Sequence, residues 1–117
     1  MKRVLVVDDA IFMRTAIKLI LEKNGYDIIG EAENGKMAIE MFISLKPELV
    51  TMDITMPVMD GIQALKAILK INADARVLMV TAMGQENMVK DAIVSGAKGF
   101  VVKPFKEEVL LKALSKL

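Results

Sequence analysis

Five short apolar runs alternate with five stretches of helical periodicity, and this alternation limits the fold of the chain more than any other feature. The apolar runs, predicted as strands, span residues 4–7, 26–32, 49–52, 76–80 and 99–102. The predicted helices span residues 10–24, 36–45, 62–71, 85–95 and 106–117. Strands that are apolar nearly throughout are typical of a parallel sheet covered by helices on both faces. The sequence therefore predicts an α/β fold, a single doubly wound five-stranded parallel sheet with five helices.

Four of the predicted strands are followed by polar residues that could take part in catalysis or ligand binding. These residues are Asp8 and Asp9, Asp53, Thr81 and Lys103. The ends of parallel strands lie on one edge of a sheet, which is where open α/β sheets bind ligands. Taken alone, Asp53 could equally start a turn, and Asp9 could cap the helix that follows it. Because polar residues recur at four strand ends, we favour a functional site over these local roles.

The composition limits the chemistry that this edge can perform. The chain has no Cys and no His, which excludes disulfides, thiolate metal sites, Cys nucleophiles and the commonest general base. The groups that remain available for chemistry at this edge are carboxylates, hydroxyls, amines and a hard cation.

Length and charge narrow the class of protein. At 117 residues the chain is long enough for one domain, predicted over residues 1–117. A formal net charge of +1 argues against a nucleic-acid-binding module. No apolar run approaches the roughly 20 residues of a membrane span, and the N-terminus leads into a strand pattern instead of a signal peptide. We therefore expect a cytoplasmic protein without membrane insertion.

The clustered carboxylates predict a metal and a phosphate. Two carboxylates 4 Å apart repel each other by about 4 kcal/mol at an effective dielectric near 20, so a positive group must lie among them. With oxygen ligands only, the fitting ion is Mg²⁺ or Mn²⁺, which is commonly shared with phosphate oxygens. Lys103 offers a compact charge for phosphate, and the Thr81 hydroxyl offers a donor. Asp53 is then left as a nucleophile that would form an aspartyl phosphate.

Several motifs along the chain resemble the receiver domains of two-component response regulators. They are Val-Asp-Asp at 7–9, Asp-Ile-Thr-Met-Pro-Val-Met-Asp-Gly at 53–61, Thr-Ala at 81–82, Gly-Ala at 96–97 and Phe-Val-Val-Lys-Pro-Phe at 100–105. Each motif is weak alone, but their common order and spacing cover essentially the whole chain. The resemblance implies a flavodoxin-like sheet of strand order 2-1-3-4-5.

The same resemblance assigns a site. It makes Asp53 the acceptor of a phosphoryl group from a partner histidine kinase. It implies that Asp8, Asp9 and Asp53 hold Mg²⁺ together with the main-chain carbonyl of Thr55, with Mn²⁺ as a substitute. Lys103 would contact the phosphoryl group, and its bond to Pro104 is expected to be cis.

The resemblance also implies a switch. The Thr81 hydroxyl would turn toward the phosphoryl group, and Phe100 would then turn inward beside it. Many receivers have a tyrosine where this chain has Phe100, so a hydroxyl is absent here. The alternative is that Phe100 is simply a core aromatic. The changed surface would include the fourth helix, where we expect Met88 and Lys90 to contact a partner.

We interpret the chain as a free-standing chemotaxis switch that is no enzyme beyond its own phosphoryl transfer and autodephosphorylation. The segment 82–85 after the fourth strand is typical of chemotaxis receivers, which makes a flagellar motor switch component the expected target. A receiver cut from a longer DNA-binding regulator would look similar. An aspartyl-phosphate phosphatase is a further alternative, but Thr55 stands where a second acid is expected. A flavodoxin-like small-ligand binder is the third.

Overall fold

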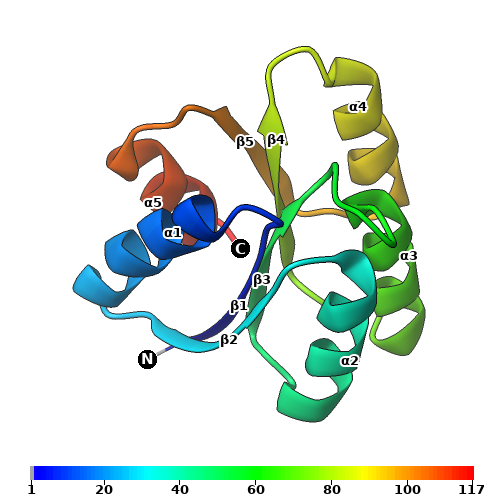
Figure 1. Ribbon diagram of the computed structural model, residues 1–117, viewed down its shortest axis with the longest axis horizontal. Helices are drawn as coiled ribbons and strands as arrows, with labels where there is room; N and C mark the ends of the chain where they lie inside the picture. Colours follow the sequence, from blue (N-terminus) through cyan, green and yellow to red (C-terminus); the bar gives the residue numbers. More distant parts are fainter. Residues whose placement is uncertain (1) are drawn as a thin grey trace.

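Strands and helices alternate along the chain as the sequence predicts. The computed structural model describes residues 2–117 (Figure 1). The strands are β1 (Arg3–Val7), β2 (Asp27–Ala32), β3 (Leu49–Asp53), β4 (Val77–Ala82) and β5 (Gly99–Lys103). The helices are α1 (Ile11–Lys23), α2 (Gly35–Leu45), α3 (Gly61–Ile71), α4 (Glu86–Ser95) and α5 (Glu107–Ser115). All strand pairs are parallel, in the order β2-β1-β3-β4-β5, which confirms the expected fold class and topology.

The sheet lies between two helical layers, with α1 and α5 on one face and α2, α3 and α4 on the other (Figure 1). Successive side chains of a strand point to opposite faces, so a strand covered on both faces is apolar throughout. In β1, Val4 and Val6 belong to the same core as Ile17 of α1. Leu5 and Val7 belong to the opposite core, against α2 and α3. This double covering explains the continuous apolar runs in the sequence.

The turn after β3 fixes the end of the strand that carries Asp53. The α3 helix begins with a capping box. The Asp60 carboxylate accepts the Gln63 main-chain N–H, and Gln63 Oε1 accepts the Asp60 main-chain N–H. Gly61 donates its main-chain N–H to the Ile54 carbonyl at 2.7 Å. A Cβ on Gly61 would overlap the main-chain oxygen of Asp53. This close approach requires glycine, and it holds Asp53 at the edge of the sheet.

Element boundaries differ from prediction by one or two residues. The β4 strand continues to Ala82, and α5 begins one residue later and ends two residues earlier than predicted. Such differences are usual at element ends, where the hydrogen-bond ladder frays. Among residues 2–117, no helix is both long and apolar enough to cross a membrane.

Candidate functional site

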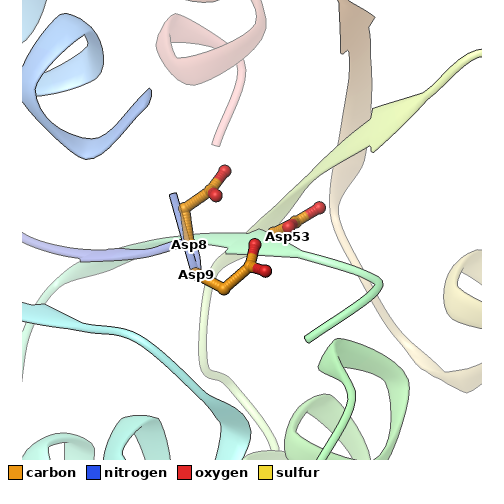
Figure 2. Close-up of side chains that lie close together, drawn as sticks. All are labelled: Asp8, Asp9 and Asp53. Carbon is orange, nitrogen blue, oxygen red and sulfur yellow. The ribbon is translucent and has the colours of Figure 1, made fainter. Parts of the chain in front are cut away.

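Three aspartates meet at the carboxyl ends of β1 and β3, which are neighbours in the sheet (Figure 2). Carboxylate oxygens of Asp8, Asp9 and Asp53 all lie within 4.8 Å of one another. Asp8 and Asp53 are buried, and Asp9 is exposed. An exposed oxygen ligand beside two buried ones suits a hard cation that keeps part of its water. The predicted cluster is therefore assembled, and its donor set fits Mg²⁺ or Mn²⁺.

The ammonium group of Lys103 also lies among the carboxylates. Its Nζ is 2.8 Å from Asp8 Oδ2 and 3.4 Å from Asp53 Oδ1. The bond between Lys103 and Pro104 is cis, as the family resemblance implies. Burial alone would lower the pKa of the Lys103 ammonium, but its bond to Asp8 and the charge of Asp53 outweigh burial and raise that pKa. Lys103 is therefore a fixed positive charge in this site.

The Asp53 carboxyl group has a raised pKa and is held by a main-chain hydrogen bond. Burial, and next the charge of Asp8, raise the pKa of Asp53 from 3.8 to about 6, although Lys103 opposes the shift. Asp53 Oδ1 accepts the main-chain N–H of Ile54 at 2.9 Å. At neutral pH the side chain is still mainly a carboxylate, which is the form that attacks phosphorus.

The β1–α1 loop is held by a residue that sequence reasoning missed. Arg14 donates from Nη1 to the main-chain carbonyl of Asp8 at 2.7 Å and from Nε to Glu31 at 3.1 Å. Asp8 Oδ1 accepts the main-chain N–H of Ala10 at 2.9 Å. The N-cap position of α1 is Ala10, so the alternative that Asp9 caps this helix is wrong. Asp9 is thereby free to serve the acidic cluster.

Thr81 lies at the same edge, but its hydroxyl is engaged elsewhere. It donates to Gln85 Oε1 at 2.6 Å, with a longer contact of 3.2 Å to the Ala82 carbonyl. Gln85 in turn donates from Nε2 to the Thr55 hydroxyl at 2.6 Å. Sequence reasoning missed Gln85 because no local pattern signals a partner 30 residues away.

Phe100 is exposed, so the alternative that it is a core aromatic is wrong. Phe100 lies on β5 and is 48% exposed. It lines an apolar hollow of about 660 Å³ between β4, β5 and α4, together with Val102, Lys90 and Ile93. The expected contact Met88 is also exposed, on the same helix. The structure thus places Phe100 beside a hollow and outside the packed core.

Comparison with known proteins decides the family. A family model for the response regulator receiver domain matches residues 4–115. The chain belongs to the receiver family. It is 58% identical over 114 residues to the chemotaxis protein CheY of Bacillus subtilis, covering 97% of this chain and 95% of that protein. It is 53% identical over 116 residues to CheY of Thermotoga maritima, covering 99% and 97%.

A solved relative has the same fold as this receiver. The crystal structure of a CheX–CheY–BeF₃–Mg²⁺ complex from Borrelia burgdorferi contains a chain that superposes with a TM-score of 0.93 at 38% identity. The match covers 97% of this receiver and 86% of that chain. These similarities make the protein a signalling receiver closely similar to CheY, a phosphorylation-activated switch in chemotaxis.

Proposed function

We propose that this receiver is a phosphorylation-activated switch of a chemotaxis phosphorelay, with Asp53 as the acceptor and a histidine kinase as the donor. One observation carries the proposal: the buried Asp53 carboxylate lies beside both the Lys103 ammonium and two further acidic side chains. The family membership and the similarity to CheY support it. We place its action in the cytoplasm.

The proposed transfer forms one bond and breaks one. Asp53 Oδ1 is occupied by the Ile54 N–H and the Lys103 ammonium, so we expect Oδ2 to attack phosphorus. The bond between phosphorus and the donor's imidazole nitrogen breaks, and the imidazole takes up a proton from water. Lys103 is close enough to shift from the Asp53 carboxylate onto a phosphoryl oxygen and neutralise its charge. Later attack by water on phosphorus would break its bond to the Asp53 oxygen, release inorganic phosphate and return the free carboxylate, which is autodephosphorylation.

The acidic residues would supply the metal site. Asp8, Asp9 and Asp53 would hold Mg²⁺, with Mn²⁺ able to substitute, and the main-chain carbonyl of Thr55 would complete the protein's ligands. When bound, the cation neutralises charge on the phosphoryl oxygens. The oxygen-only donor set and the mixed burial of the three aspartates support this assignment.

The output would pass through Thr81 and Phe100. A phosphoryl group on Asp53 has strong acceptor oxygens, which would draw the Thr81 hydroxyl toward it. The vacated space lets Phe100 turn inward from its exposed position and reshape the apolar hollow beside α4. A target protein that prefers the inward state, such as a flagellar motor switch component, would then bind more tightly.

Mg²⁺ should raise the melting temperature of the wild-type protein, and Asp9→Ala should remove that increase. A ligand of the folded state stabilises it by mass action, and Asp9 offers the exposed ligand of the cluster. Melts are recorded by circular dichroism, with millimolar MgCl₂ against EDTA. Asp74→Ala changes an exposed acid outside the cluster and serves as the control. Mg²⁺ should raise its melting temperature as much as that of wild type. An equal Mg²⁺ response in Asp9→Ala would show that the metal assignment is wrong.

Phe100→Ala should leave phosphorylation of Asp53 near normal but weaken its coupling to target binding. Coupling of this kind typically changes affinity by roughly 5- to 150-fold, and the variant should retain only a small part of the wild-type factor. Calorimetry measures the affinity for a motor switch fragment with and without phosphorylation. A folded variant that keeps the full factor would exclude Phe100 as the switch. A wild-type protein with no change in affinity on phosphorylation would contradict the proposed function itself.

A further inference from the structure

Gln85 connects the end of β4 to the loop that follows β3. Its Oε1 accepts the Thr81 hydroxyl at 2.6 Å and the Ala82 main-chain N–H at 2.9 Å. Its Nε2 donates to the Thr55 hydroxyl, in the loop after β3, at 2.6 Å. We call these three contacts the Gln85 bridge. The bridge spans from the end of β4 to the residue two positions after Asp53.

Helix capping does not explain this arrangement. Gln85 occupies the N-cap position of α4, where a polar side chain commonly accepts a main-chain N–H from the first turn. The Gln85 side chain makes no such bond. Its amide is directed backward to Thr81, Ala82 and Thr55 instead. The side chain therefore contacts the end of β4 and the loop after β3, and not the helix that it precedes.

The bridge engages the hydroxyl that the proposed switch requires. Thr81 is 1% exposed, so its hydroxyl needs a hydrogen-bond partner inside the protein. A hydroxyl has one proton to donate, and in this structure Gln85 Oε1 receives it. Thr81 follows Val80, which pairs with Asp53 across β3 and β4. Turning the hydroxyl toward a phosphoryl group on Asp53 must therefore break its bond to Gln85.

We propose that Gln85 is a positioning residue that holds Thr81 in the resting state and thereby sets how readily the receiver switches. This inference rests on the proposed function, because it needs Thr81 to move when Asp53 carries a phosphoryl group. Within the Gln85 bridge, the Thr81 contact exists only while the Thr81 hydroxyl donates to Gln85 and not to a phosphoryl group on Asp53, so this contact stabilises the resting state selectively. A contact made in one of two states shifts the population toward that state. Loss of the bridge should therefore favour the active state.

The test uses beryllofluoride, a non-covalent mimic of the phosphoryl group, titrated into the full chain at saturating Mg²⁺ and followed by calorimetry. Gln85→Ala should bind it about fivefold more tightly than wild type, the effect of losing roughly one net hydrogen bond from the resting state. Asn87→Ala, which changes an exposed residue in the first turn of α4, is the matched control and should bind beryllofluoride as wild type does. A merely structural role for Gln85 would leave the affinity equal or weaker.

A double-mutant cycle tests whether the effect passes through Thr81. In a Thr81→Ala background the hydroxyl is gone, so adding Gln85→Ala should change beryllofluoride affinity little. An equal gain in both backgrounds, or no gain in the single variant, overturns the inference about Gln85. A wild-type chain that binds no beryllofluoride contradicts the proposed function instead. The two failures are therefore distinguishable.

Discussion

Asp53→Asn should stabilise the metal-free protein by about 3 kcal/mol at pH 7. Burial and the neighbouring Asp8 raise the pKa of Asp53 in the folded chain from 3.8 to about 6. Between these pH values the folded state holds a proton that the unfolded chain has already released. The folded state therefore loses stability as the pH rises through this window, by about 3 kcal/mol for a shift of this size. Asparagine has no proton to lose and so escapes this penalty, and the opposing attraction of Lys103 is already part of the raised pKa of Asp53.

The measurement is urea denaturation in EDTA from pH 4 to pH 8. The difference in unfolding free energy between Asp53→Asn and wild type should be small at pH 4 and should grow until about pH 7. Asp74→Asn, at an exposed aspartate outside the site, should follow the wild-type profile. If Asp53→Asn and wild type have parallel pH profiles, the raised pKa of Asp53 is wrong.

Lys103→Met should destabilise the metal-free protein by about 3 kcal/mol at pH 7.5, because it leaves buried carboxylates without their cation. The Lys103 side chain is only 20% exposed, and it contacts both Asp8 and Asp53. Millimolar Mg²⁺ should recover much of the loss, since the acidic cluster then has another positive partner. The variant should also transfer the phosphoryl group more slowly and respond to it less.

Urea denaturation with EDTA or with MgCl₂ measures both parts of the Lys103 prediction. Lys98→Met removes an exposed lysine near the opposite end of β5 and controls for the general effect of losing a positive charge. Lys98→Met should change the free energy of unfolding by no more than about 0.5 kcal/mol, as ordinary surface substitutions do. A loss below about 1 kcal/mol in Lys103→Met would show that Lys103 is not the main charge partner of the buried acids.

The fold and the acidic site could be predicted because both follow from strand pattern. Parallel strands bring their carboxyl ends to one edge, so Asp8, Asp53 and Lys103 converge without any knowledge of loop conformation. The apolar continuity of the strands showed that helices cover both faces. The helix predicted over residues 62–71 is α3, which begins one residue earlier at Gly61 with Asp60 as its N-cap.

The contacts around the site could not be predicted, because they depend on side-chain conformations in loops. Gln85 meets Thr55 across 30 residues, and Arg14 reaches Glu31 on a neighbouring strand. Whether Asp9 or Ala10 occupies the N-cap position of α1 is a choice between adjacent residues that helix propensity does not decide. The exposure of Phe100 follows from the edge position of β5, where its neighbour Val101 faces the core and Phe100 faces the hollow.

The most direct test of the account is to locate a phosphoryl group on the chain. The protein is incubated with Mg²⁺ and acetyl phosphate, and borohydride reduction then converts any aspartyl phosphate to homoserine before peptide mass spectrometry. We expect one modified residue, Asp53, and no modification in Asp53→Asn or when EDTA replaces Mg²⁺. Homoserine at another aspartate, or wild-type labelling of Asp53→Asn, would contradict the assignment of Asp53 as the acceptor.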